Sequence, residues 1–196
     1  TTESTALTEG SVFAGRYRVV RRIASGGMGA VYEVLHLETN RRRALKVMLP
    51  EVVHDEELRT RFLREARVTA EIQTEFIVEV FDAGVDDEHK SPFLVMELLR
   101  GEELSHRLRR LKRLPAREVV TLLEQAAVAL DKTHAASIVH RDLKPANLFL
   151  TERDDGSPRI KILDFGIAKL LAEGAHTHVT TSIGTPLYMA PEQLRP

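Results

Sequence analysis

The distribution of apolar residues changes at Gly101, and this change constrains the fold more than any other feature of the sequence. Before Gly101, five short apolar runs bounded by turn residues are typical of β-strands, and one stretch at 56–71 has the apolar spacing of a helix. After Gly101, helical stretches dominate. We therefore predict an α+β fold of two lobes, with an antiparallel five-stranded sheet and one packed helix over 13–99 and a mainly helical lobe over 100–196.

The expected elements follow from the local pattern. Strands are predicted at 17–23, 30–35, 43–48, 77–85 and 93–98. In the second lobe we expect a short basic helix at 103–111, a longer helix at 115–137, and a hairpin of strands at 148–150 and 160–163. Apolar residues cover more than one face of the longer helix, so we expect it to be buried on several sides. Residues 1–12 hold six Ser and Thr residues, and we predict a disordered tail there.

Composition excludes several classes of protein. The chain has 28 Lys and Arg residues against 29 Asp and Glu residues, so no net field attracts it to nucleic acid. It has no cysteine, which excludes a disulfide scaffold, a thiolate zinc site and a cysteine nucleophile. No apolar run reaches the roughly 18 residues of a membrane-spanning helix. We expect a cytoplasmic location, and a membrane anchor beyond Pro196 stays open.

Two features of the first lobe are candidate functional residues, each with a simpler structural interpretation. The tip of the first hairpin, Gly26–Gly29, lets backbone N–H groups approach a phosphate, but it is equally typical of a plain flexible turn. Lys46 interrupts an apolar strand, where a lysine either extends to water at an edge or pairs with a carboxylate. Glu65, 19 residues later on the predicted helix, is the candidate partner.

The segment His140–Asn147 concentrates His, Arg, Asp, Lys and Asn directly after the longer helix. Such side chains are costly near a core unless they have partners. Asp142 can accept a proton, Lys144 can bind phosphate, and Asn147 offers an oxygen to a metal ion. Further along, Asp164 follows an apolar strand and stands next to Phe165-Gly166, a position suited to a hard cation.

Taken together and in this order, these segments resemble the protein kinases. The resemblance is carried by Gly26–Gly29, Val31, Ala44–Lys46, Glu65, His140–Asn147, Asp164–Gly166, Gly184–Thr185 and Ala190–Glu192. Lys144-Pro145 resembles the Ser/Thr kinases, and Phe62–Ala66 resembles their bacterial members. The similarity covers roughly residues 13–196.

The resemblance implies a site for ATP. The backbone of the glycine loop covers the phosphates, and Lys46 holds the α- and β-phosphates and pairs with Glu65. Val31, Ala44 and Phe149 sandwich the adenine, and Glu97–Leu99 offer it backbone hydrogen bonds. The expected nucleotide-binding residues are Ile23, Ala24, Ser25, Gly26, Gly27, Met28, Gly29, Val31, Ala44, Lys46, Met96, Glu97, Leu99 and Phe149.

The resemblance also assigns the catalytic roles. Asp142 orients the substrate hydroxyl and accepts its proton, while Lys144 neutralises charge on the moving phosphoryl group. Asn147 and Asp164 hold Mg²⁺. His140 is implied to be a packed, hydrogen-bonded residue behind Phe165 and not a base.

A switch is implied by Arg141, which in similar kinases pairs with a phosphate on the activation segment. We expect that phosphate on Thr177, Thr180 or Thr181. Thr185 is expected to contact the catalytic residues instead.

Three positions depart from the family pattern. Ala24 stands at the usual first loop glycine, and Thr74-Glu75 replaces a common His-Pro. The chain also stops four residues after Glu192, before the large helices that complete the second lobe in this family. We expect residues 1–196 alone to self-associate through the exposed surface of that lobe and to transfer little phosphate.

The leading hypothesis is an ATP- and Mg²⁺-dependent Ser/Thr protein kinase acting on protein substrates. The alternatives are a non-catalytic nucleotide-binding or interaction module and a small-molecule phosphotransferase. The basic stretch at 100–117 is interpreted as a solvated helix face rather than a docking site. His176 and His178 lack a third ligand and are not interpreted as a metal site.

Overall fold

The computed structural model describes residues 6–26, 29–49, 56–164 and 186–194. Contacts divide the chain into a first unit, 1–70 with 79–99, and a second unit, 71–78 with 100–196. Among the described residues, no helix is both long and apolar enough to cross a bilayer.

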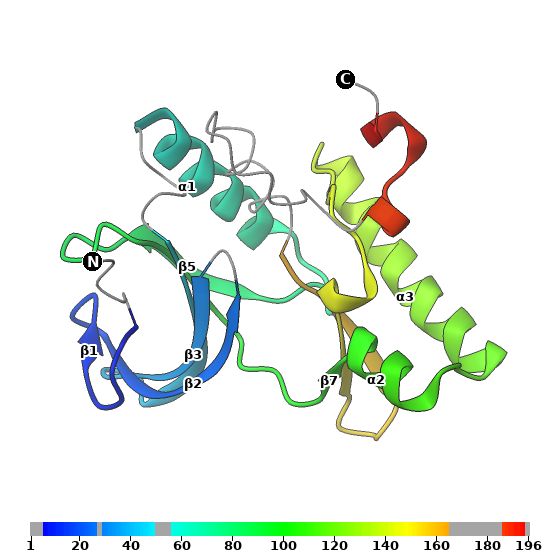
Figure 1. The fold of residues 1–196 in the computed structure, drawn as a ribbon, viewed down its shortest axis with the longest axis horizontal. Coiled ribbons are helices and arrows are strands. Elements are labelled where there is room, and N and C mark those ends of the chain that lie inside the picture. The colour runs from blue at the N-terminus through cyan, green and yellow to red at the C-terminus, as the bar shows by residue number, and fades with distance from the viewer. Residues whose placement is uncertain (1–5, 27–28, 50–55, 165–185, 195–196) are drawn as a thin grey trace. The chain divides into compact units, whose positions relative to one another are not determined.

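The first unit is built on a curled antiparallel sheet with strand order β1-β2-β3-β4-β6-β5 (Figure 1). Its strands are β1 (Val12–Phe13), β2 (Tyr17–Gly26), β3 (Gly29–His36), β4 (Arg41–Met48), β5 (Val80–Val85) and β6 (Pro92–Met96). Helix α1 (Glu56–Glu71) lies between β4 and β5 in the chain. The predicted order of three strands, a helix and two strands is therefore present, with β1 as an additional short strand.

The structure differs from the expected disordered tail at residues 1–12. Among its described residues, the N–H of Leu7 donates to the Tyr32 hydroxyl at 3.1 Å and the N–H of Gly10 donates to the carbonyl of Val19 at 2.8 Å. Val12 already belongs to β1, which pairs with β2. These are backbone contacts, and a composition rich in Ser and Thr does not indicate them.

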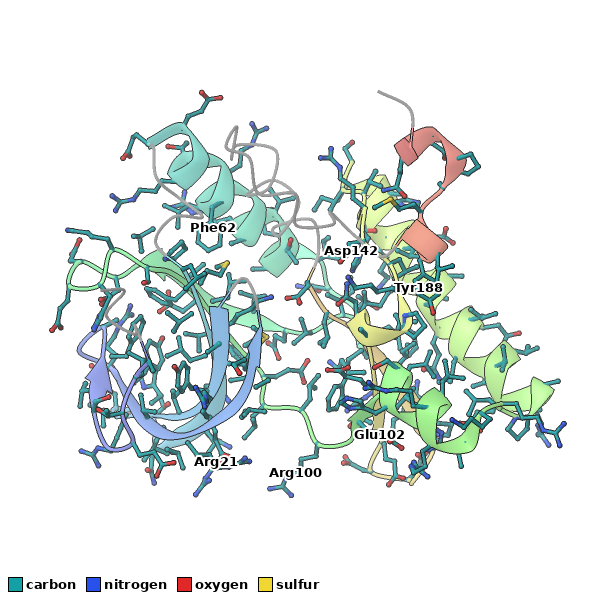
Figure 2. All side chains as sticks on the ribbon, in the orientation of Figure 1. Arg21, Phe62, Arg100, Glu102, Asp142 and Tyr188 are labelled. Carbon is teal, nitrogen blue, oxygen red and sulfur yellow. The ribbon has the colours of Figure 1, made fainter. Side chains whose placement is uncertain are left out.

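Alternating side chains of the sheet form the core of the first unit. In β3, Tyr32 and Val34 are buried, and they pack with residues of the neighbouring strands. The cluster consists of Phe13, Tyr17, Val19, Tyr32, Val34, Leu45, Val47, Phe93 and Val95. On α1, Phe62 and Ala66 are buried, one helical turn apart (Figure 2). The residues of this cluster alternate along each strand, and this period of two holds the sheet in one register.

The second unit packs helices against a small sheet of order β7-β8-β9. Its elements are β7 (Glu102–Glu103), α2 (Leu104–Leu111), α3 (Ala116–Ala135), η2 (Pro145–Asn147), β8 (Leu148–Glu152), β9 (Pro158–Ile162), η3 (Pro186–Tyr188) and η4 (Pro191–Leu194). The core combines one stripe of α3 with the two longer strands: Leu122, Ala126, Ala129, Leu148, Ile160 and Ile162, joined by Ile77.

The opposite face of α3 corrects the expectation of burial on several sides. Val120 is 53% exposed, Leu123 60% and Val128 46%. The described residues therefore bury one stripe of this helix and leave a second apolar stripe, Val120, Leu123 and Val128, in contact with solvent. An apolar pattern on two faces predicts that both can be buried, but it does not say whether a partner is present.

Residues 71–78 lie on the second unit, although the sequence pattern merged 77–85 into one strand. The N–H of Ile162 donates to the carbonyl of Phe76 at 2.8 Å, and the N–H of Val78 donates to the carbonyl of Ile162 at 3.0 Å. This parallel pairing extends β9, and β5 begins only at Val80. The apolar run is continuous in sequence, although Ile77 and Val78 are buried beside β9 and β5 is only partly buried in the first sheet.

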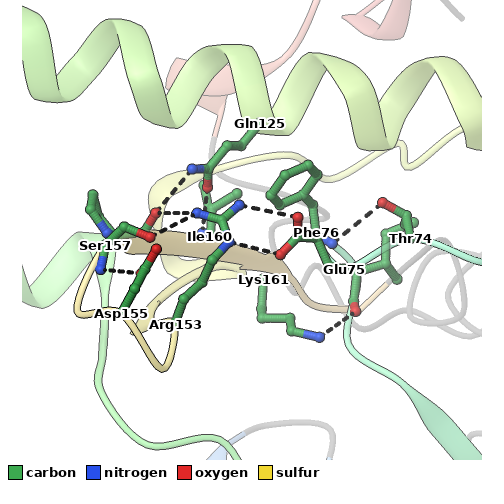
Figure 3. Close-up of polar contacts among 11 residues, drawn as sticks. Thr74, Glu75, Phe76, Gln125, Arg153, Asp155, Ser157, Ile160 and Lys161 are labelled. Carbon is green, nitrogen blue, oxygen red and sulfur yellow. Dashed lines mark hydrogen bonds and ion pairs between the residues drawn. The ribbon is translucent and has the colours of Figure 1, made fainter.

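Side-chain hydrogen bonds connect residues 71–78 to the hairpin of β8 and β9 (Figure 3). Arg153 makes two bonds to the Glu75 carboxylate, at 2.9 Å from Nε and 3.1 Å from Nη2. Lys161 donates from Nζ to the carbonyl of Ile77 at 3.2 Å. On α3, the Gln125 amide bonds the exposed edge of β9, donating to the carbonyl of Pro158 and accepting from the N–H of Ile160. Glu75, a departure from the family pattern, therefore has a defined partner here.

Candidate active site

The two described glycines of the glycine loop differ in how much space they leave for a side chain. Gly26, the last residue of β2, pairs with Gly29, the first residue of β3, and residues 27 and 28 lie outside the described residues. Gly29 has φ +145°, and a Cβ there would lie 2.1 Å from the carbonyl oxygen of Val47. At Gly26 a Cβ would meet nothing within 4 Å. Of these two positions, the sheet requires glycine at Gly29, because β4 approaches so closely there.

Strand register places five predicted nucleotide-binding residues on one face of the sheet. Ala24 pairs with Val31, and Val31 pairs with Lys46. Ala44 is two residues from Lys46 on β4, and it pairs with Met96 on β6. Directly paired residues, and residues two apart on a strand, point to the same side. The hairpin side chains Ile23 and Ser25 are exposed.

The predicted ion pair between Lys46 and Glu65 stays a prediction. Lys46 is half-buried on β4. Position 65 lies within α1, but its side chain is outside the described residues. The helix and the strand both exist as the sequence indicated.

Part of the expected purine contact is already used within the first unit. The N–H of Glu97 donates to the carbonyl of Glu79 at 3.0 Å, and the N–H of Glu79 donates to Oε1 of Glu97 at 2.9 Å. The backbone N–H of Glu97 is therefore engaged.

In the second unit, two predicted residues, Lys144 and Asn147, bond the carboxylate of Asp142, which is labelled in Figure 2. Lys144 Nζ lies 2.8 Å from Asp142 Oδ2. The side-chain amide of Asn147 donates to the same oxygen at 3.1 Å and to the backbone carbonyl of Asp142 at 2.7 Å. Asp142 and Lys144 remain about a quarter exposed, at 26% and 22%. A short turn, η2, brings Asn147 back toward Asp142.

His140 supports this cluster as a neutral residue. It is buried, its Nδ1 lies 3.3 Å from the N–H of Asp142, and its Nε2 lies 2.8 Å from the carbonyl of Leu163. An N–H needs an acceptor and a carbonyl needs a donor, so Nδ1 is bare and Nε2 carries the proton. Burial lowers the pKa of His140, against a smaller opposing effect of the Leu163 carbonyl. Both ring nitrogens of His140 thus bond backbone groups, on either side of the ring.

Two backbone conformations around the cluster are unusual. Arg141 has φ +64° and Asp164 has φ +55°, both in the left-handed region. Such conformations are disfavoured for residues with a Cβ and persist where surrounding contacts hold them. They occur next to the two carboxylates to which the sequence assigned chemistry.

Asn147 and Asp164 suit a magnesium ion. Both donors of the Asn147 amide bonds described above lie on Nδ2, which leaves Oδ1 as an oxygen ligand. The N–H of Leu163, the neighbour of Asp164, donates to the carbonyl of Asn147 at 2.9 Å. Mg²⁺ in nucleotide sites is held by one or two carboxylates, phosphate oxygens and water. The described residues contain no group of three or more His, Cys, Asp or Glu side chains that could hold a metal unaided.

Gly101 has a role that the sequence did not reveal. It has φ +141°, and a Cβ there would lie 1.9 Å from the carbonyl oxygen of Leu150 and 3.2 Å from the ring of Phe149. Phe149, a predicted adenine contact, lies on β8 opposite Glu103. The sequence indicated Gly101 only as the boundary between the two lobes. In the structure, the absence of a side chain at Gly101 allows the backbone to pack directly against β8.

The predicted phosphorylation sites Thr177, Thr180 and Thr181, as well as Thr185, lie outside the described residues. So do Gly27, Met28 and the aromatic ring of Phe165. Glu192 on η4 is exposed.

Comparison with known proteins agrees with the sequence resemblance. A model of the protein kinase domain matches residues 17–196. The chain is 46% identical over 183 residues to serine/threonine-protein kinase Pkn1 of Myxococcus xanthus, covering 93% of this chain and 26% of Pkn1. It is 42% identical over 187 residues to PknA of Mycobacterium tuberculosis, covering 94% of this chain and 42% of PknA. The chain thus spans less than half the length of these relatives.

The fold is also similar to a solved kinase domain. The crystal structure of the Mycobacterium tuberculosis PknI kinase domain matches with a TM-score of 0.72 and 39% sequence identity. The match covers 83% of this chain and 64% of that one. The predicted two-lobed α+β fold is confirmed by this likeness.

Proposed function

This chain belongs to the protein kinase family, and on that premise we propose that it transfers the γ-phosphoryl group of ATP to Ser and Thr residues of protein substrates, including its own, with Mg²⁺. The observation that carries the proposal is the cluster of Lys144 and Asn147 on the Asp142 carboxylate. Phosphoryl transfer depends on positioning and on cations rather than on covalent chemistry, and this cluster provides both.

Asp142 has the geometry of a proton acceptor that is held in place. Among the described residues, its side-chain partners lie on Oδ2, so Oδ1 is the oxygen for the substrate hydroxyl. Lys144 shares Oδ2 and carries its positive charge to the same point, where it stabilises the charge on the transferring phosphoryl group. The bonds from Asn147 stop the carboxylate from rotating.

Asn147 and Asp164 would hold Mg²⁺, which neutralises phosphate charge when bound. In the first unit, the face formed by Ala24, Val31, Ala44, Lys46 and Met96 supplies an apolar surface for adenine and one ammonium group for phosphate. ATP is a cytoplasmic substrate, so the proposal places this domain in the cytoplasm.

Phosphate transfer from radiolabelled ATP tests the proposal on the full-length gene product. Asp142→Asn keeps the shape of the side chain and its bond to Lys144 but cannot take a proton, so transfer should fall by about 10²–10⁴-fold. ATP binding should persist, since Asp142 is not among the nucleotide contacts. Equal phosphate transfer by the wild type and by Asp142→Asn would show that Asp142 is not the proton acceptor.

A second candidate function is a non-catalytic interaction module, favoured by the exposed stripe Val120, Leu123 and Val128 on α3. An apolar patch of this kind promotes association. A folded wild-type protein that binds ATP and transfers no phosphate to any protein would favour this alternative.

A further inference from the structure

We propose that Gln193 is a positioning residue for Asp142, an inference that rests on the proposed function. Gln193 lies on η4, far from the catalytic loop in sequence, yet its Nε2 donates to the carbonyl of Arg141 at 2.9 Å. Its Oε1 accepts from the N–H of Ala190 at 3.1 Å. One side chain therefore joins the turn at Ala190–Gln193 to the residue before the proton acceptor.

The bonded carbonyl belongs to the peptide unit between Arg141 and Asp142. The N–H of that same peptide unit, on Asp142, donates to Nδ1 of His140 at 3.3 Å. A peptide unit is planar, so a bond at its oxygen and a bond at its nitrogen together fix its rotation. This rotation sets where the Asp142 side chain leaves the backbone, because Asp142 Cα is part of the plane.

The conformation that Gln193 holds is not one that the chain adopts by preference. Arg141 has φ +64°, a region disfavoured for a residue with a Cβ. A peptide in that position relaxes unless neighbouring groups oppose it. Gln193 bonds the carbonyl of this very residue, so loss of the bond should let the loop move toward a common conformation and turn the Asp142 carboxylate.

Gln193 is itself well held. The N–H of Gln193 donates to the carbonyl of Ala190 at 2.9 Å, so main chain and side chain both close the turn. The side chain uses a donor at one end and an acceptor at the other, which only an amide of this length supplies. A glutamate would place a second oxygen against the carbonyl of Arg141, and alanine would leave that carbonyl without this donor.

Gln125 provides a matched control. It is likewise a glutamine whose amide bonds two backbone groups, the carbonyl of Pro158 and the N–H of Ile160. Among the described residues, its side chain makes no hydrogen bond to the catalytic loop, His140–Asn147. Gln125→Ala reports what the loss of such an amide does to stability alone. Gln193→Ala and Gln193→Glu report the same loss beside Asp142.

Steady-state kinetics of phosphate transfer give the first test, on the full-length gene product. Both Gln193 variants should lower kcat by roughly ten- to a hundredfold with the KM for ATP within about twofold of wild type, because misplacement of a catalytic group costs that much. Gln125→Ala should lower the melting temperature and leave kcat close to wild type. A Gln193 variant with wild-type kcat would overturn the proposal.

Hydrogen–deuterium exchange gives a second test that needs no activity. Exchange of a peptide spanning 138–147 should become faster in both Gln193 variants and stay unchanged in Gln125→Ala. Unchanged exchange there in the Gln193 variants would also overturn the proposal. If the wild-type protein transfers no phosphate, the proposed function fails on that result, while the exchange data still decide whether Gln193 holds the loop.

Discussion

The predicted site residues are positioned in different ways in the two units. In the first unit, Val31, Ala44 and Lys46 share a face because backbone pairing between β3 and β4 sets the register. This placement does not depend on contacts between the three side chains. In the second unit, Asp142 is placed by side-chain bonds from Lys144 and Asn147. A surface set by backbone pairing should tolerate side-chain replacement, whereas a loop set by side chains should lose its geometry when one of them is removed.

Replacing Lys144 should have the largest effect, because it should lower phosphate transfer strongly while ATP binding persists. Lys144→Ala removes the ammonium group that pairs with Asp142 Oδ2 and supplies charge to the phosphoryl group. We expect kcat to fall by about 10²–10³-fold, the effect of removing one donor from a charge-stabilising site. The affinity for ATP should change little. Transfer kinetics and an ATP titration together check this, and an equal loss in both would contradict a separate role for the loop.

The two glycines at the ends of β2 and β3 test whether the backbone geometry of the sheet requires glycine. Gly29→Ala places a Cβ against the carbonyl of Val47, in a backbone conformation that L-residues avoid. We expect a loss of about 3 kcal/mol in the free energy of unfolding. Gly26→Ala meets open space and is the matched control. Urea denaturation measures both, and equal stabilities for the two variants would show that β3 and β4 do not approach as described.

Neighbouring leucines on α3 separate stability from association. Leu122 is 4% exposed and Leu123 is 60% exposed. Leu122→Ala should cost about 2–5 kcal/mol in the free energy of unfolding, the usual range for such a change in a core.

Leu123→Lys should leave the stability of the fold nearly unchanged and lower self-association of the 196-residue chain. Sedimentation velocity over a range of concentrations measures this. Unchanged association in Leu123→Lys would place the contact surface elsewhere.

His140 predicts a smaller, pH-dependent effect. Its pKa is lowered in the folded protein, so the unfolded chain binds a proton more readily. His140 therefore makes its full contribution to the free energy of unfolding above about pH 6.5, the usual pKa of histidine. This contribution decreases as the pH falls below that value. Melting temperatures from pH 8 to pH 5 should fall less in His140→Gln than in wild type. Parallel curves would mean that His140 does not titrate on unfolding.

The sequence predicted much of the first unit because its information is local. Apolar runs of the right length indicated β2, β3, β4 and β6, and the turns between them set the register that aligns Val31 with Lys46. The same patterns did not separate Ile77 from Val80, because an apolar run does not show that its two parts pair with different sheets.

In the second unit, motifs identified the residues but not what holds them. Asp142, Lys144 and Asn147 were named from their spacing and chemistry. Gln193 and Gln125 had no sequence signal, because each acts on backbone groups distant in the chain. Likewise, the requirement for glycine at position 101 depends on the carbonyl of Leu150, which only the folded hairpin brings near.

Calorimetric titration of the folded 196-residue chain with ATP, with and without Mg²⁺, tests most directly whether this chain has the proposed Mg²⁺-dependent ATP site. We predict saturable binding that Mg²⁺ strengthens. Lys46→Met should weaken it, and Asp164→Asn should make it insensitive to Mg²⁺. A folded chain that binds no ATP, or that binds it equally with and without Mg²⁺ in all three proteins, would contradict the account.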